Sequence, residues 1–111
     1  MIRSKLIRKG EAIKQMEFEG KTLRLEAKSE KMESIFIRME EGTEFGRMFS
    51  HEGEEIHIVL RGTVEYMVGG QIYHLEVGDT LWHDSSLPHT ARNAGKGVSK
   101  SLTISTGPTF M

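Results

Sequence analysis

One stretch in the middle of the chain decides the fold: TVEYMVGGQIYHLEV, residues 63–77. Apolar and polar residues alternate on both sides of Gly69-Gly70, as they do in a hairpin that has one covered face. Two adjacent glycines suit the positive φ angles of a two-residue turn. Because the turn length sets the register, the stretch predicts four cross-strand pairs: Val68 with Gln71, Tyr66 with Tyr73, Glu65 with His74, and Val64 with Leu75.

The same register predicts which face of the hairpin is covered. Side chains along a strand alternate between its two faces, so one face collects most of the apolar residues. The opposite face carries the pair Glu65 and His74, an acid and an imidazole of an ordinary kind for a wet surface. The predicted core face consists of Val64, Tyr66, Tyr73, Leu75 and Val77.

Short alternating runs continue in both directions from this hairpin. They cover residues 23–27, 35–40, 80–83 and 100–105, and the chain has 12 glycines to supply tight turns between them. Residues 11–18 fit a helix or a strand and are predicted as a strand, with a turn at Gly20-Lys21. Seven to nine short strands in 111 residues predict a single all-β domain, either a sandwich or a closed barrel.

Composition excludes several classes of function. The 15 basic and 16 acidic residues give a formal charge of −1, without the basic run that nucleic-acid binding requires. No segment resembles a helix-turn-helix, and no apolar run reaches the roughly 18 residues of a membrane span. Charges interrupt the apolar residues of the N-terminus, which is not typical of a signal peptide. Cysteine is absent, which excludes disulfides, zinc fingers, iron–sulfur clusters and thiol chemistry. We therefore expect a cytoplasmic protein with no membrane and no direct nucleic-acid partner. The excess of Glu and Lys over Gln and Asn is typical of thermophiles.

Histidines supply the candidate chemistry. Glu55 and His57 share a face if they lie on one strand, and His51 directly precedes that strand. His89 arrives from a different strand. Imidazole nitrogens and a carboxylate that converge in this way form sites for first-row transition metals. By itself, however, this spacing more often comes from scattered surface histidines.

Two motifs around these histidines resemble those of the cupin family. Residues 50–62, SHEGEEIHIVLRG, are similar to the first cupin motif, and residues 78–93, GDTLWHDSSLPHTARN, are similar to the second. The Gly69-Gly70 hairpin and the ending at residues 105–110 further resemble the sensor cupins of helix-turn-helix regulators. The resemblance covers residues 45–110 and implies a cupin jelly-roll barrel, the double-stranded β-helix. Residues 1–44 are then expected to supply additional barrel and dimerisation strands, within one domain over residues 1–111.

The resemblance also implies a metal site. The family pattern has four ligands, and His51, Glu55 and His89 occupy the second, third and fourth positions. Phe49 occupies the first position and cannot bind a metal. The implied cofactor is a divalent transition metal, Fe, Mn, Ni, Co or Zn. His57 has three interpretations: a replacement ligand, an acid or base in the pocket, or a core histidine with satisfied hydrogen bonds.

Other residues near the motifs are further candidates for the pocket. Tyr66 and Trp82, with Tyr73, are predicted to pack in the core rather than to stack on a ligand. The sequence does not decide which face His83 occupies. Arg61 and Arg92 suit a carboxylate ligand but are predicted on the solvated surface.

Two functions remain open from the sequence. The first is a metal-dependent isomerase, lyase or dioxygenase that acts on a small polar organic molecule. The second is a metal-free module that binds or senses a small molecule without catalysis. We also expect a homodimer, because exposed edge strands need cover, with residues 2–8 or 23–27 as candidates for exchange between protomers.

Overall fold

The computed structural model describes residues 3–107, which form nine strands and no helix. Within this range, therefore, no helix is long and apolar enough to cross a membrane. Every strand pairing is antiparallel. The strands are β1 (Lys14–Phe18), β2 (Lys21–Lys28), β3 (Glu33–Met39), β4 (Glu54–Arg61), β5 (Val64–Val68), β6 (Gln71–Leu75), β7 (Thr80–Asp84), β8 (His89–Asn93) and β9 (Ser99–Ser105).

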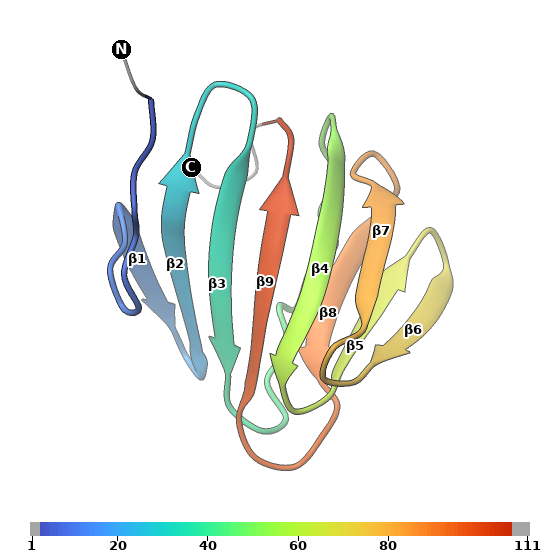
Figure 1. The fold of residues 1–111 in the computed structure, drawn as a ribbon. Coiled ribbons are helices and arrows are strands. Elements are labelled where there is room, and N and C mark those ends of the chain that lie inside the picture. The colour runs from blue at the N-terminus through green and yellow to red at the C-terminus, as the bar shows by residue number, and fades with distance from the viewer. Residues whose placement is uncertain (1–2, 108–111) are drawn as a thin grey trace.

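The strands form two layers (Figure 1). Six of them make a large sheet in the order β1-β2-β3-β9-β4-β7, and three make a small sheet in the order β6-β5-β8. Successive strands such as β7 and β8 lie in different sheets, so the chain crosses repeatedly between the layers. This arrangement confirms the predicted all-β jelly roll.

The hairpin register is confirmed at all four predicted pairs, from Val68 with Gln71 to Val64 with Leu75. Its turn is formed by Gly69 and Gly70, with φ angles of 55° and 83°. The strand predicted in residues 11–18 is present as β1. Its turn lies one residue earlier than expected, at residues 19–20.

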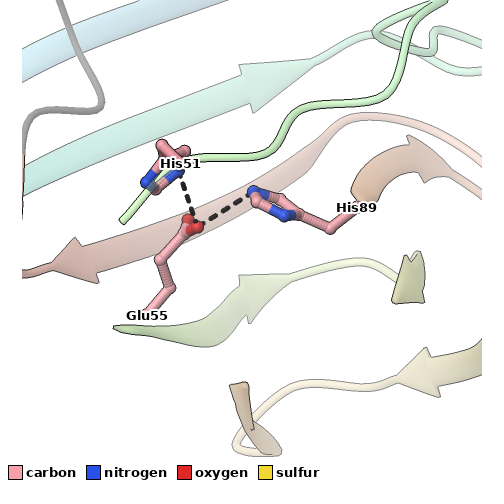
Figure 2. A group of neighbouring side chains, drawn as sticks. All are labelled: His51, Glu55 and His89. Carbon is pink, nitrogen blue, oxygen red and sulfur yellow. Dashed lines mark ion pairs between the residues drawn. The ribbon is translucent and has the colours of Figure 1, made fainter. Parts of the chain in front are cut away.

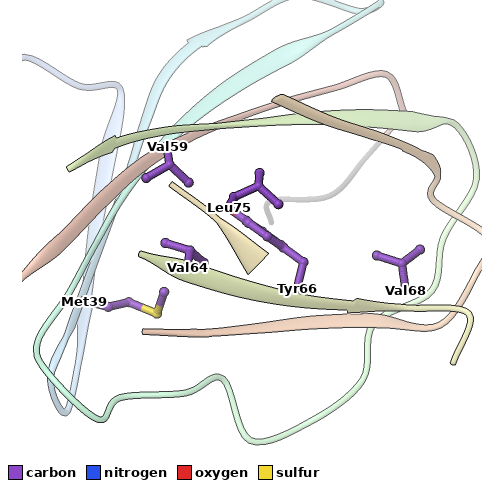
Figure 3. Close-up of a cluster of buried hydrophobic side chains, with 6 residues drawn as sticks. All are labelled: Met39, Val59, Val64, Tyr66, Val68 and Leu75. Carbon is purple, nitrogen blue, oxygen red and sulfur yellow. The ribbon is translucent and has the colours of Figure 1, made fainter. Parts of the chain in front are cut away.

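The apolar core lies between the two sheets (Figure 3). It joins Met39 and Val59 of the large sheet to side chains of the β5–β6 hairpin. A smaller cluster, Leu25 with Ile35, lies between β2 and β3. The complete central cluster is Met39, Val59, Val64, Tyr66, Val68 and Leu75.

Three residues predicted in the core are exposed instead. Tyr73 is 41% exposed, because β6 is an edge strand of the small sheet and is covered only at Leu75. Val77 is 63% exposed, because it lies beyond β6 in the turn before β7. Trp82 is 57% exposed. Since adjacent side chains on a strand point to opposite faces and its neighbour His83 is buried, Trp82 points outward.

The strands proposed for exchange do not form free edges. Residues 23–27 lie in β2, which is paired on both sides by β1 and β3. Residues 3–8 form no strand. Ile2 and residues 108–110, which contribute to the expected exchange segment and to the family resemblance, lie outside the described residues.

Candidate metal centre

Three segments bring the predicted ligands to one point inside the barrel. Glu55 is an inward-facing residue of β4, and His89 begins β8 in the opposite sheet. His51 comes from the loop before β4. Gly53 allows this loop to turn with a φ of 100°, where a Cβ would lie 2.0 Å from the carbonyl oxygen of Thr106. The four-residue spacing between His51 and Glu55 therefore contains a position that only glycine can occupy.

Both histidines direct Nε2 at the same carboxylate oxygen (Figure 2). Glu55 Oε2 lies 3.0 Å from His51 Nε2 and 2.9 Å from His89 Nε2. The carboxylate is buried, with 5% exposure, whereas the side chain of His51 is 19% exposed. The three ligand atoms lie within 4.8 Å of one another, a separation that suits a single metal ion.

Backbone carbonyls fix the other nitrogen of each ring. His51 Nδ1 lies 3.0 Å from the carbonyl oxygen of Glu52, and His89 Nδ1 lies 2.7 Å from that of Leu87. A carbonyl only accepts hydrogen bonds, so each Nδ1 carries the hydrogen. When such a ring is neutral, the lone pair is on Nε2, where a metal would need it. Without a metal, His89 donates from Nε2 to Glu55 only when its ring carries both protons.

The charge of the cluster also suits a cation. Burial raises the pKa of Glu55, but the hydrogen bond from His89 and the nearby imidazoles outweigh burial and lower the pKa to about 2. Glu55 is therefore a carboxylate at neutral pH. Burial lowers the pKa of His89, but its contact with Glu55 outweighs burial and raises the pKa overall. Two imidazoles and one carboxylate form a donor set that fits a divalent first-row metal.

Phe49 closes the position where the family pattern has its first ligand. Its backbone N and O pair with the backbone of His89, at 2.7 and 2.9 Å. The Phe49 ring lies 6.3 Å from the His89 ring and packs edge-on against Phe45. The residue therefore holds the start of β8 in place and supplies an apolar wall.

His57 and His83 form a buried chain of hydrogen bonds beside this cluster. His57 Nδ1 lies 2.8 Å from Thr103 Oγ1, and its Nε2 lies 2.9 Å from His83 Nε2. His83 Nδ1 donates to the carbonyl oxygen of Asp84 at 2.8 Å. With both rings neutral, one pattern satisfies the whole chain: Thr103 donates to His57, and His57 donates to His83. Burial lowers the pKa of His57 to about 3, so the ring is neutral at physiological pH.

The same pair gives a second group of possible ligands, Glu55 with His57 and His83. His57 Nε2 is 3.7 Å from Glu55 Oε1. In this group, however, His57 Nε2 is hydrogen-bonded to His83 Nε2, so neither nitrogen has a lone pair directed at an ion. The group of His51, Glu55 and His89 is therefore the better candidate for a metal site, and the interpretation of His57 as a hydrogen-bonded core histidine fits the geometry best.

The remaining candidates divide between the cavity and the surface. Tyr66 is buried, with its ring 4.5 Å from that of His57, and burial raises its pKa to about 12. Trp82 lies on the outer face, where its Nε1 donates to Glu54 at 2.7 Å, so it does not line the cavity as a pocket residue. Arg61 is exposed. Arg92 is exposed too and pairs with Glu65, as does His74.

A cavity of about 140 Å³ adjoins the cluster. Thr103 and Ser101 lie in its wall, and neither is among the pocket residues predicted from the sequence. The signal was available, because inward positions of β9 alternate as Ser99, Ser101, Thr103 and Ser105, all of them buried. The apolar part of the wall is formed by Leu23, Ile35, Ile37, Met39, Phe45, Phe49 and Ala91.

The family follows from comparison with known proteins. A family model described as the cupin domain matches residues 35–105. The chain belongs to the cupin family. The regulator PuuR of Escherichia coli, described as a helix-turn-helix-type transcriptional regulator, is 34% identical over 76 residues, which are 68% of this chain. This cupin spans only 41% of that regulator's length.

Solved structures share the fold at low sequence identity. KdgF from a Halomonas species aligns with a TM-score of 0.83 at 17% identity, over 96% of both chains. An RmlC-like cupin from Shewanella frigidimarina aligns with a TM-score of 0.78 at 18% identity, over 97% of this cupin and 96% of that chain. These likenesses extend the fold comparison to the N-terminal strands, which the family model does not cover.

Proposed function

We propose that this cupin binds one divalent transition metal through His51, Glu55 and His89, and binds a small organic ligand beside it. The observation that carries the proposal is the convergence of two Nε2 atoms on Glu55 Oε2, with both Nδ1 atoms held by carbonyls. When bound, the metal would polarise an oxygen of the ligand or, if it is redox-active, support oxygen chemistry.

The cavity favours a particular kind of ligand. About half of the residues that line the cavity are aliphatic or aromatic, and the rest are polar and include the proposed ligands His51, Glu55 and His89. A small molecule with an oxygen donor at one end and an apolar body at the other fits this division.

Turnover and binding without turnover remain separate versions of this proposal. Isomerase, lyase and dioxygenase chemistry each use a metal with room for a substrate oxygen. His57 is a buried acid–base group beside Glu55, but burial keeps its ring neutral, and its two nitrogens are hydrogen-bonded to Thr103 and His83. The similarity to part of a transcriptional regulator favours ligand binding, and a metal-free sensing module is therefore the second candidate.

Metal content tests the proposal directly. Protein purified without nickel resin is analysed by elemental mass spectrometry, with His89→Ala and His51→Ala beside wild type. His74→Ala is the matched control, because His74 lies on the surface with 64% of its side chain exposed. We expect close to one metal per chain in wild type and His74→Ala, and loss in the other two variants.

The two candidate functions predict different results after chelation. Small carboxylates and other oxygen-donor molecules are titrated calorimetrically into the protein before and after metal removal. Binding that is lost on chelation supports the metal-dependent site. Binding that persists in metal-free protein supports the sensing module. Wild-type protein that takes up no metal, even after reconstitution, contradicts the metal site.

A further inference from the structure

A short segment at the edge of the small sheet separates the inner cavity from an outer groove. Residues 44–49, which we call the strap, run antiparallel to β8 and join it at two isolated bridges. Phe45 and Phe49 of the strap line the cavity beside the metal cluster. Residues 46–48, by contrast, line an outer groove of about 490 Å³. This volume falls within the range of roughly 300–1,000 Å³ that small-molecule sites have, whereas the inner cavity is smaller.

The groove exists because the strap leaves β8 between its two anchors. Phe49 N donates to His89 O at 2.7 Å, and Phe45 N donates to Ala91 O at 3.2 Å. Between these bonds the strap has more residues than β8, so the excess bulges away from the sheet edge. Gly46 lies in the bulge with a φ of 77°, an angle that glycine adopts readily. The groove lies between this bulge and residues of β5 and β8.

Two donors on the β8 side of the groove have no partner. The Thr90 hydroxyl is buried and forms no hydrogen bond with any described residue. The amide N–H of Ala91 faces the strap, because the Ala91 carbonyl accepts from Phe45, yet no backbone acceptor within residues 3–107 reaches it. Both Thr90 and Ala91 line the groove. Since polar groups inside proteins are normally satisfied, these two donors favour a ligand that brings acceptor atoms.

Two side chains of the strap bring unpaired charges of opposite sign to the groove. The Arg47 guanidinium lies 4.7 Å from the centre of the Phe49 ring and forms no ion pair within residues 3–107. Stacking holds a guanidinium by its face and leaves its N–H edges free for an oxyanion. The Glu44 carboxylate is also without an ion pair in the described part of the chain. Lys21 donates at 2.7 Å to the backbone oxygen of Glu44 rather than to its carboxylate.

The other charges at the groove are already paired. Arg92 donates to both carboxylate oxygens of Glu65, at 2.9 and 3.1 Å, so its hydrogen bonds do not reach Glu44, its neighbour in register. Met48 and Met67 supply apolar surface that adapts to the shape of a ligand. Within the described residues, the groove therefore combines one unpaired cation, one unpaired anion and an apolar surface.

We propose that this groove binds a small zwitterion, namely an amino acid with an apolar body. Its carboxylate binds Arg47 and the donors of β8, its ammonium group binds Glu44, and its body packs on Met48 and Met67. A simple anion or a simple cation would neutralise only one of the two free charges, whereas a zwitterion neutralises both. The site is separate from the metal cluster and does not depend on whether a metal is bound.

Four molecules with the same number of carbon atoms test the need for both charges. L-norvaline and δ-aminovalerate carry an ammonium group and a carboxylate, whereas valerate and pentylamine carry one charge each. In two-dimensional amide NMR titrations of the full chain, at least one of the amino acids should shift the amides of Gly46, Met48 and Ala91 at millimolar concentration. We expect it to bind at least about tenfold tighter than valerate and pentylamine, because each of these lacks one charged contact. The proposal is overturned if neither amino acid binds, or if a molecule with one charge binds equally well.

Variants then locate the bound amino acid. Arg47→Gln and Glu44→Gln should each weaken binding about tenfold. Arg8→Gln and Glu30→Gln are the matched controls, because they remove the same charges at exposed positions outside the groove, and they should bind as wild type does. His89→Ala should also retain binding. Binding that is lost in His89→Ala but survives Arg47→Gln and Glu44→Gln would place the amino acid on the metal, which overturns the groove site and leaves the proposed metal function intact. Circular dichroism checks that every variant is folded.

Discussion

At the scale of single residues, Glu55 sets the electrostatics of the barrel interior. Its carboxylate contacts His51 and His89 on one oxygen and lies near His57 on the other. His89 gains enough from this contact to raise its pKa, whereas burial lowers the pKa of His57 to about 3. The pKa values of these two histidines are therefore shifted in opposite directions, and their contributions to stability depend on pH with opposite sign.

The first prediction concerns His57 in chelator-treated protein. Between its ordinary pKa of 6.5 and about 3, the unfolded chain binds a proton on His57 that the folded chain does not bind. Stability therefore falls as pH drops through this window, by about 2 kcal/mol from pH 6.5 to pH 5. His57→Gln keeps a donor and an acceptor without titrating and should remove this part of the slope, measured by urea unfolding at each pH. An unchanged slope would contradict a neutral His57.

His89 contributes with the opposite sign in the same experiment. Its raised pKa gives stability that is fully present below pH 6.5 and is lost as pH rises through the folded pKa. Glu55 contributes only at lower pH, between its ordinary 4.5 and about 2. The comparison of wild type with His57→Gln above pH 5 thus isolates one histidine.

The second prediction concerns the missing ligand. Phe49 lies beside His89 with its backbone already paired to it, so a histidine here would start from an anchored position. Phe49→His should tighten metal binding at least tenfold, measured by competition with a chromophoric chelator, because a fourth protein ligand replaces water. Phe49→Leu, which supplies no ligand, should not tighten it. Equal affinity in the histidine and leucine variants would show that position 49 cannot reach the ion.

At the scale of elements, the loop before β4 holds the spacing of the site. The third prediction is that Gly53→Ala destabilises the fold by several kcal/mol and weakens metal binding, because the new Cβ would meet the Thr106 carbonyl and the φ is positive. Gly70→Ala is the matched control: its φ is also positive, but nothing lies within 4 Å, so it should cost only about 1 kcal/mol. Thermal unfolding and chelator competition measure the two effects. Similar losses in both variants would contradict the role of the close approach.

Some features of the strands could be predicted from the sequence, and others could not. Alternation and a two-glycine turn were sufficient for the register of β5 and β6, since both are local properties of the chain. The exposure of Tyr73 and Trp82 was not predictable in the same way. It depends on which strand lies at a sheet edge and which face the other sheet covers, and both follow from pairings between distant segments.

The candidate metal site also has a part that could be predicted from the sequence and a part that could not. The resemblance to the two cupin motifs pointed to His51, Glu55 and His89 as ligands, and the structure brings their ligand atoms within 4.8 Å of one another. The partner of His57 could not be named, because His83 and Thr103 meet it from two other strands. The alternating Ser and Thr of β9 did indicate a polar interior, because all four inward positions carry a hydroxyl side chain.

At the scale of the whole molecule, metal binding and folding should be coupled. The three proposed ligands come from a loop, from β4 in the large sheet and from β8 in the small sheet, so the unfolded chain has no preformed site. An ion that binds only the folded state stabilises it by about 2.7 kcal/mol at 100 times its Kd. For a domain of this size, the increase in Tm should be about 10 °C.

The fourth prediction follows from this coupling. The Tm of wild type should rise with the logarithm of metal concentration, measured by scanning calorimetry on chelator-treated protein, and His74→Ala should behave identically. His89→Ala should show no rise, because it removes the only ligand from the small sheet and the remaining two share one segment. A rise of equal size in His89→Ala would mean that the ion binds within residues 51–57 alone, and that it does not hold the two sheets together.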